Sequence, residues 1–274
     1  MAILTDQPAS YEVVSSAGAG SPWIAMVHGV SQDHRVFDRQ VEAFEQDFRL
    51  LLLDLPGHGR SATLPGPYGL QEYAASISGA LDLAGVNQCH FWGTHLGAGA
   101  GLVLACEEPS RFVSMILEGP VFPGRPLPSV STLLARISSI ARTEGMAAAR
   151  DAWWRQGPWF EIMRARPDEC RAAEQRAIID SFPGTPWLDD GLVSRALPPL
   201  KQALAALKVP VLIMNGQHDV PDFVEAADAL AAIMPDCRRV EIEDAGGFPL
   251  WEFPERVNSV AADFLRQLRR GKRG

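Results

Sequence analysis

The chain has 274 residues, of which 47% are hydrophobic and 21% are charged, so it is long enough and apolar enough to bury a sizeable core. Its 33 acidic residues outnumber its 25 lysines and arginines, and the net charge of −8 argues against binding to nucleic acid or to an anionic membrane surface. The four scattered cysteines lack metal or disulfide spacing, and no signal peptide or membrane-length apolar run is found. We therefore expect a cytoplasmic protein with reduced thiols.

Short apolar runs alternate with amphipathic stretches, a rhythm typical of an α/β fold with a mostly parallel sheet. An extended piece at residues 11–16 is a candidate edge strand. The other predicted strands cover residues 23–28, 49–53, 88–92, 112–118, 210–215 and 238–242. Apolar residues at three- and four-residue spacing predict helices around residues 36–48, 70–81, 223–234 and 257–268.

The alternation stops between residues 121 and 208, where the pattern is helical and poor in strands. We predict a helical lid at 121–208, inserted between two strands of a core formed by residues 1–120 and 209–274. Four tryptophans of this stretch are candidates for lining a substrate pocket, because pockets are mostly apolar and favour such junctions. The alternative is that these residues pack the core of the lid itself. They are Trp153, Trp154, Trp159 and Trp187.

The most informative segment is Gly93-Thr-His-Leu-Gly97, through which a predicted strand runs directly into a helix. With serine at its centre, this strand–turn–helix arrangement is a nucleophile elbow, and small flanking residues are needed because the turn is tight. A dinucleotide-binding interpretation is disfavoured, because the following glycines are spaced G-x-G-x-G and not G-x-G-x-x-G.

With four further segments, this turn makes the chain resemble the α/β-hydrolase-fold family over nearly its whole length. Val27-His-Gly-Val30 resembles the oxyanion loop, and Asp54-Leu-Pro-Gly-His-Gly-Arg-Ser61 resembles the turn after the next strand. Gly216-Gln-His-Asp219 resembles the loop of the catalytic acid, and Ala245-Gly-Gly-Phe-Pro-Leu-Trp251 resembles the segment of the catalytic histidine. The resemblance implies an α/β-hydrolase fold, a mostly parallel sheet flanked by helices.

Two positions depart from the family pattern. His95 stands where the nucleophile is expected, and Gly247 stands where the resemblance places the catalytic histidine. A serine triad needs both a hydroxyl nucleophile and a base that takes its proton. We therefore do not expect an ordinary serine esterase.

His95 is instead the candidate general acid and base, because imidazole can give and take protons near neutral pH. Either Asp219, in the acid loop, or Glu118, at the end of a predicted strand, is expected to orient it, and the sequence leaves both open. The backbone N–H groups of Val30 and Leu96 are expected to form an oxyanion hole, because their positions depend on the turn and not on its central side chain.

These parts suit proton abstraction beside a carbonyl or from a phenol, on a small apolar or aromatic substrate and without a cofactor. The reaction would be of the lyase, isomerase, cyclase or oxygenase type. Two alternatives stay open. One is a hydrolase of activated esters or lactones with His95 as the nucleophile. The other is a catalytically silent ligand-binding protein that kept the fold and the pocket.

Two further histidines are candidate pocket residues, although packing roles are an alternative. His28 lies in the segment that resembles the oxyanion loop. His34 lies in Ser31-Gln-Asp-His-Arg-Val-Phe37, a stretch that resembles cofactor-independent ring-cleaving dioxygenases of the same fold, whose base is the histidine replaced here by Gly247. No metal motif is found. We expect a small-molecule substrate and no nucleic-acid or membrane partner, and a homo-oligomer remains open.

Overall fold

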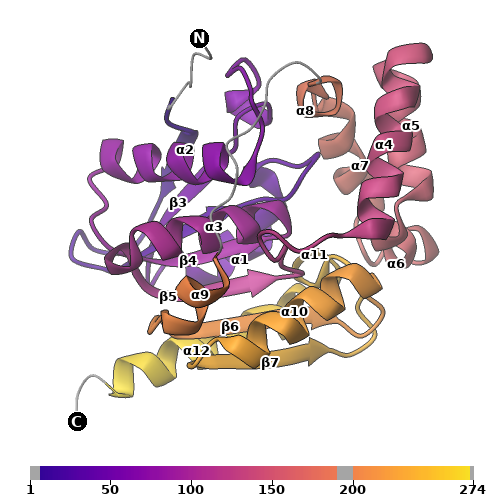
Figure 1. Cartoon of the computed structure of the whole chain (residues 1–274). Helices are drawn as coiled ribbons and strands as arrows, with labels where there is room; N and C mark the ends of the chain where they lie inside the picture. Colours follow the sequence, from indigo (N-terminus) through magenta and orange to yellow (C-terminus); the bar gives the residue numbers. More distant parts are fainter. Residues whose placement is uncertain (1–6, 190–199, 272–274) are drawn as a thin grey trace.

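The computed structural model describes residues 7–189 and 200–271 and shows a seven-stranded sheet in the order β1-β3-β2-β4-β5-β6-β7 (Figure 1). β1 pairs antiparallel with β3, and the other neighbours pair in parallel. The predicted α/β class is confirmed, and each predicted strand is present with ends that differ by at most two residues. The strands are β1 (Ser10–Val14), β2 (Trp23–Val27), β3 (Arg49–Asp54), β4 (Cys89–Thr94), β5 (Phe112–Glu118), β6 (Val211–Gly216) and β7 (Cys237–Ile242).

Helices cover both faces of the sheet, because the side chains of each central strand alternate between two buried clusters. In β2, Ile24 and Met26 join the cluster beneath α1 and α12, whereas Ala25 and Val27 join the cluster beneath α2, α3 and α10. Short helices complete the connections. The covering helices are α1 (Asp38–Phe44), α2 (Leu70–Leu83), α3 (Leu96–Glu107), α10 (Pro221–Ile233) and α12 (Pro254–Gly271), and the short ones are η1 (His34–Phe37), η2 (Gly59–Ser61), η3 (Pro109–Arg111) and α11 (Pro249–Glu252).

A helical segment lies between β5 and β6 in the chain and sits beside the carboxyl ends of the parallel strands, at the right of Figure 1. We call its helices α4 to α8 the helical insertion. They are α4 (Pro128–Thr143), α5 (Met146–Gln156), η4 (Pro158–Phe160), α6 (Glu161–Ala165), α7 (Ala172–Ser181) and α8 (Thr185–Leu188).

The next helix, α9 (Lys201–Ala206), packs away from the helical insertion. Leu200, Leu204 and Leu207 are buried in the same cluster as α3 and α10, beneath the sheet. The stretch predicted as a lid at 121–208 is therefore not a single unit in the structure, because its last helix, α9, is part of the core. Residues 190–199, within that predicted lid, lie outside the described residues.

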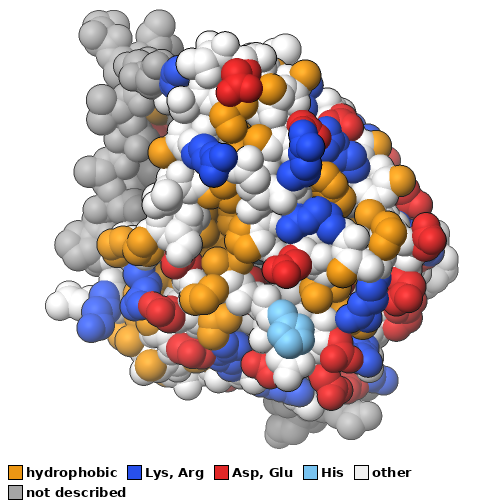
Figure 2. All heavy atoms as spheres, turned by 90° about the vertical axis from the view of Figure 1, so that its right-hand side faces the viewer, with side chains coloured by type: hydrophobic (Ala, Val, Ile, Leu, Met, Phe, Trp, Pro, Cys, Tyr) orange, Lys and Arg blue, Asp and Glu red, His pale blue; other side chains and the backbone are white. Residues whose placement is uncertain are grey.

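The surface on the side of the helical insertion carries mixed charge. Figure 2 shows acidic and basic side chains interspersed with apolar ones on this face. Several opposite charges pair directly, as in Arg176 with Asp180 and Arg171 with Asp38. No described helix is both long and apolar enough to cross a membrane. All four cysteines are free thiols.

Candidate active site

His95 occupies the tip of a sharp turn between β4 and α3. Its backbone has φ +43° and ψ −106°, a conformation that costs a non-glycine residue free energy. A methyl group on Gly97 would lie 2.4 Å from the carbonyl oxygen of Val27, and one on Gly93 would lie 2.7 Å from the amide nitrogen of Ala98. The turn therefore needs glycine on both sides. It forms the elbow that the sequence predicts, with a histidine at its tip.

The His95 side chain is 6% exposed, and its ring meets the rings of Phe223 and Phe248 edge-on, with centroids 4.8 and 4.6 Å away. Burial lowers the pKa of His95 to about 4, although the nearby Gly247 carbonyl partly opposes this shift. Neither ring nitrogen has a hydrogen-bond partner of normal geometry among the described residues. The imidazole is therefore neutral at physiological pH, and its lone pair is not used by a protein donor.

Asp219 lies next to His95, but the two form no hydrogen bond. Its carboxylate accepts hydrogen bonds from Asn215 Nδ2 and from the backbone N–H of Val220, both at 2.7 Å. A methyl group on Gly119 would lie 2.9 Å from His95 Nε2 and 3.4 Å from Asp219 Oδ2, so these two atoms flank the same small space. Burial raises the pKa of Asp219 to about 7. The predicted neighbour is present, but the predicted dyad is not formed.

Glu118 does not orient the imidazole through its carboxyl group. Its backbone carbonyl accepts the N–H of His95 at 2.8 Å, whereas its carboxylate accepts the N–H of Leu250 at 2.9 Å. Burial raises the pKa of Glu118 well above its ordinary value, and raises that of the neighbouring Glu252 to about 8. The Glu118 side chain thus supports the turn that contains α11, which corrects its predicted role beside His95.

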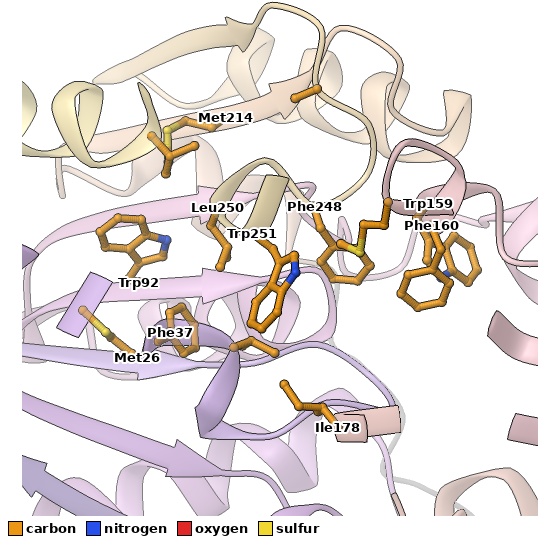
Figure 3. Close-up of a cluster of buried hydrophobic side chains, with 14 of the residues drawn as sticks. Met26, Phe37, Trp92, Trp159, Phe160, Ile178, Met214, Phe248, Leu250 and Trp251 are labelled. Carbon is orange, nitrogen blue, oxygen red and sulfur yellow. The ribbon is translucent and has the colours of Figure 1, made fainter. Parts of the chain in front are cut away.

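The space next to Gly247 is filled by the helical insertion. A methyl group on Gly247 would lie 2.3 Å from Trp159 Cβ and 3.4 Å from Asp219 Oδ1. The main chain at Gly247 therefore passes close to Asp219, as the resemblance implies. Trp159, however, occupies the space that a histidine side chain at position 247 would need. Figure 3 shows Trp159 and Phe160 beside Phe248, and the rings of Phe160 and Phe248 stack at 5.4 Å. The packing around Trp159 thus leaves no room for a side chain at position 247.

A cavity of about 430 Å³ opens beside His95. A smaller space of about 30 Å³ adjoins it, between His95 and the rings of Trp153, Trp159, Phe223 and Phe248. No Asp, Glu, Lys or Arg is among the described residues that line the larger cavity. Its lining consists of Val30, Tyr68, Leu70, Tyr73, His95, Leu96, Val121, Leu127, Val130, Ser131, Leu134, Ala135, Ser138, Pro186, Trp187 and Phe223.

The two predicted oxyanion donors lie on this cavity. Val30 follows β2, Leu96 begins α3, and both residues line the cavity together with His95. Within the described part of the chain, neither N–H donates to another backbone carbonyl. The N-terminus of α3 also favours negative charge at this point, because its first N–H groups are unpaired and the helix dipole is positive there.

The structure brings three of the six other predicted pocket residues to the site. Trp187 lines the large cavity, and Trp153 and Trp159 line the small one. Trp154 lies outside both linings and packs against Phe160 at 5.0 Å. His28 and His34 also lie outside both linings, which corrects their predicted place in the pocket.

His28 and His34 serve the loop structure beneath the site. His28 Nδ1 donates to the Gly29 carbonyl at 2.7 Å, and its Nε2 accepts the Leu55 N–H at 3.0 Å. His34 Nδ1 lies 3.0 Å from both carboxylate oxygens of Asp54, which also accepts the N–H of Arg60 at 3.0 Å. Burial opposes ionisation of Asp54, but these donors hold the pKa of its carboxyl well below the ordinary value.

Three ligand-type side chains gather in this loop region, those of Asp33, His34 and Asp54, with ligand atoms within 4.8 Å of one another. Each already has a protein partner, because Asp33 holds Arg35 and His34 pairs with Asp54. These three side chains therefore use their potential ligand atoms in hydrogen bonds that stabilise the loop.

The sequence interpretation missed several residues of the site. Three aromatic residues line the cavity: Tyr68 from the loop before α2, Tyr73 from α2 and Phe223 from α10. The sequence offered only helical spacing for Tyr73 and Phe223, and no signal for Tyr68. Phe248 closes the small space beside His95. Gln32 is buried near the same histidine; it lies in the segment of residues 31–37, of which the sequence interpretation singled out only His34.

Comparison with known proteins identifies the family. The family model for the alpha/beta hydrolase fold matches residues 22–254. The chain is 30% identical over 256 residues to a 2-succinyl-6-hydroxy-2,4-cyclohexadiene-1-carboxylate synthase from Enterobacter sp., covering 90% of this chain and 93% of the relative. It is 28% identical to a pimeloyl-acyl-carrier-protein methyl ester esterase from Nitrosomonas europaea, covering 90% of this chain and 96% of that one.

Solved structures agree on the fold. The structure of MenH from S. aureus superposes with a TM-score of 0.81 at 19% identity, covering 94% of this chain and 98% of that one. The enol-lactonase from Burkholderia xenovorans LB400 superposes with a TM-score of 0.78 at 24% identity, covering 94% and 96%. With its sheet order, its elbow and these matches, the chain belongs to the alpha/beta hydrolase fold family of enzymes.

Proposed function

We propose that this chain is an enzyme that acts without a cofactor on a small, neutral, apolar or aromatic substrate with a carbonyl or phenolic group. His95 serves as the general acid and base. One observation carries the proposal: a neutral imidazole with two unpaired nitrogens stands at the elbow tip and opens on a cavity whose described lining has no charged side chain. The helical insertion covers this cavity and acts as a lid.

In the proposed reaction, the substrate oxygen accepts hydrogen bonds from the N–H groups of Val30 and Leu96. His95 takes a proton from the adjacent carbon or from the phenol, and the negative charge stays on oxygen. An imidazole whose conjugate acid has a pKa of about 4 is a weak base on its own. A developing oxyanion beside it raises that pKa, because an opposite charge at short range stabilises the imidazolium. Proton transfer is thus favoured only when a suitable substrate is bound.

The cavity lining supports a neutral substrate. A carboxylate moved into an apolar cavity without a cationic partner loses its hydration without compensation. Burial raises the pKa of Tyr73 well above its ordinary value, so its hydroxyl stays protonated and able to donate to an uncharged oxygen. The Enterobacter relative is named as a carboxylate synthase. We propose that this chain has a different preference.

The test is a panel of matched compounds. Neutral aryl ketones, hydroxylated heteroaromatics and enol lactones are each paired with an analogue that carries one carboxylate. Consumption is followed by mass spectrometry, and incorporation of deuterium from D₂O next to the carbonyl reports proton abstraction. We expect wild type to act on neutral members, His95→Ala to lose this activity, and the carboxylate analogues to remain unchanged. Equal deuterium exchange by wild type and His95→Ala contradicts the proposal.

A second candidate is a hydrolase in which His95 attacks an activated ester or lactone. It is favoured by the same neutral imidazole, which has a free lone pair without help from a base. Mass spectrometry of acid-quenched protein after mixing with a neutral aryl ester separates the two reactions. An acyl group on His95 supports attack by the nitrogen, whereas deuterium exchange without an adduct supports general base catalysis. Binding of the panel with neither outcome supports a silent binding protein.

A further inference from the structure

Gln32 is a buried amide without partners beside the proposed base. It lies two residues after Val30, is 2% exposed, and neither its Oε1 nor its Nε2 has a hydrogen-bond partner among the described residues. A buried polar group left unpaired costs about 1–3 kcal/mol. Such a group in a functional loop needs an explanation other than stability.

Gln32 Oε1 and His95 Nδ1 both lie next to the α-carbon face of Gly29 where a side chain would stand. A methyl group on Gly29 would lie 3.3 Å from Gln32 Oε1 and 3.4 Å from His95 Nδ1. Both atoms therefore border the space that the missing side chain of Gly29 leaves open. His95 Nδ1 is itself unpaired in the structure. An unpaired acceptor, Gln32 Oε1, and an unpaired ring nitrogen that can carry a proton, His95 Nδ1, thus lie on the same side of Gly29.

We propose that Gln32 is a positioning residue that fixes the tautomer of His95. Gln32 Oε1 accepts the Nδ1–H of the neutral imidazole, which leaves the lone pair on Nε2. A rotamer change of the glutamine brings the two atoms together, because its side chain has three rotatable bonds. The tautomer follows from the packing around His95, whereas its importance for turnover rests on the proposed function.

The groups on the other side of the ring are compatible with this tautomer. His95 Nε2 faces Asp219 Oδ2 across Gly119, and that oxygen already accepts the amide of Asn215. The raised pKa of Asp219, about 7, keeps a proton on its carboxyl group below neutral pH and so weakens it as an acceptor. Phe223 and Phe248 cover the ring with carbon edges. The Gly247 carbonyl, which raises the pKa of His95, is a further acceptor for a ring N–H. The competing arrangement, Nε2–H donated to Asp219 or to that carbonyl, gives the opposite tautomer.

Nuclear magnetic resonance distinguishes the two tautomers directly. Protein labelled with ¹⁵N-histidine is examined at neutral pH by two-bond ¹H–¹⁵N correlation, whose pattern tells which ring nitrogen carries the proton. The signals of His95 are assigned by their loss in His95→Ala, because the chain has six histidines. We expect the Nδ1–H form in wild type. We expect Gln32→Leu to convert His95 to the Nε2–H form or to a mixture.

Two further variants exclude a merely structural effect. Burial will raise the pKa of a carboxyl introduced by Gln32→Glu, as it does for Asp219 and Glu252, so this variant is examined at a pH above that pKa. There it keeps an acceptor at Nδ1 and adds a negative charge, so it should keep the Nδ1–H form and raise the pKa of His95 above about 4. Gln175→Leu is the matched control, because Gln175 is also fully buried with both amide atoms unpaired but lies on α7. It should leave the His95 spectrum unchanged.

An Nε2–H form in wild type overturns the proposal and supports Asp219 or the Gly247 carbonyl as the partner. The same wild-type tautomer in Gln32→Leu also overturns it. These outcomes do not depend on a known substrate, so they stay separate from a failure of the proposed function. Once a substrate is found, Gln32→Leu should lower kcat more than it changes KM. Gln32→Glu should move the acidic limb of the pH–rate profile to higher pH.

Discussion

His34 and His95 both follow a strand of the parallel sheet at its carboxyl end, but their surroundings differ in every polar contact. His34 Nδ1 donates to Asp54 at 3.0 Å, and its Nε2 accepts Arg60 at 3.0 Å. Among the described residues, neither nitrogen of His95 has a hydrogen-bond partner of normal geometry, and its ring borders the cavity. The loop around Asp54 uses its polar groups to hold its own backbone. At the elbow, the backbone of His95 is hydrogen-bonded, whereas its ring nitrogens have no partner of normal geometry among the described residues.

This difference separates structural from functional histidines better than sequence motifs do. A buried polar group that is fully hydrogen-bonded stabilises one loop conformation, and removing a partner leaves other groups unsatisfied. A buried polar group that is unpaired beside a cavity is available to a ligand. The two regions should therefore respond to mutation in opposite ways, one in activity and the other in stability.

The largest expected effect is on turnover. His95→Ala should lower kcat on a neutral substrate by about 10²–10⁴-fold, the usual contribution of a general base. Circular dichroism and cooperative thermal unfolding should stay close to wild type. His34→Ala is the matched control, and it should retain turnover while it is folded. A His95→Ala protein with wild-type kcat would show that His95 is not the general base and that its difference from His34 does not concern activity.

The second effect is on stability. Asp54→Ala should lower the free energy of unfolding by about 3 kcal/mol or more, because the backbone N–H groups of His34 and Arg60 and the His34 ring lose their shared acceptor. Urea denaturation measures this change. Asp54→Asn keeps one acceptor oxygen and should cost less. A stability loss below that of His34→Ala would show that Asp54 does not organise the loop.

A third, smaller effect is expected at the position of the missing base. Gly247→Ala should lower the free energy of unfolding by about 1–3 kcal/mol, because its methyl group would lie 2.3 Å from Trp159 Cβ. Gly20→Ala is the control, since nothing lies within 4 Å of the added carbon there. Thermal unfolding compares the two. For the same steric reason, His95→Ser with Gly247→His should not create an esterase, and efficient ester hydrolysis by that protein would refute this assignment of Trp159.

The last effect is on the pH dependence of stability. The folded pKa values of Asp219 and Glu252 are raised to about 7 and 8, from ordinary values of 3.8 and 4.5. At a pH between the ordinary and the raised pKa of each carboxyl group, the folded state keeps a proton that the unfolded state has lost, so stability falls as pH rises. His95, lowered to about 4 from 6.5, opposes this trend only below pH 6.5.

The melting temperature should therefore drop between pH 6.5 and about pH 8.5. Glu252→Gln should reduce the drop, because a neutral amide has no proton to lose. Calorimetry at three pH values is sufficient. A melting temperature that rises over this range would show that the buried acids are not protonated in the folded state.

The sequence predicted the strands and the elbow because these features depend on local rules. The apolar runs of β2 to β6 are buried on both faces, and such runs are recognisable without knowing their neighbours. The elbow follows from Gly93 and Gly97, because a turn this tight excludes other side chains. Val30 and Leu96, whose N–H groups the sequence proposes as oxyanion donors, also line the cavity.

The sequence could not place the residues whose role depends on distant segments. His28 lies within the segment that resembles the oxyanion loop, and His34 follows it. Hydrogen bonds to Leu55 and Asp54, more than one element away, turn them from the cavity. The choice between Asp219 and Glu118 was open for the same reason. The carboxyl of Glu118 is taken by Leu250, which is 132 residues away in the chain.

The sequence by itself determined the family fold, the histidine at the elbow tip and the absence of a base at position 247. Each of these depends on residue identity and on short-range spacing. Only the tertiary structure decided that Trp159 fills the space beside Gly247, that Asp219 and His95 are neighbours without a hydrogen bond, and that Gln32 and His95 both border Gly29. These facts depend on which side chains from separate elements share one space, and packing, not local propensity, sets that arrangement.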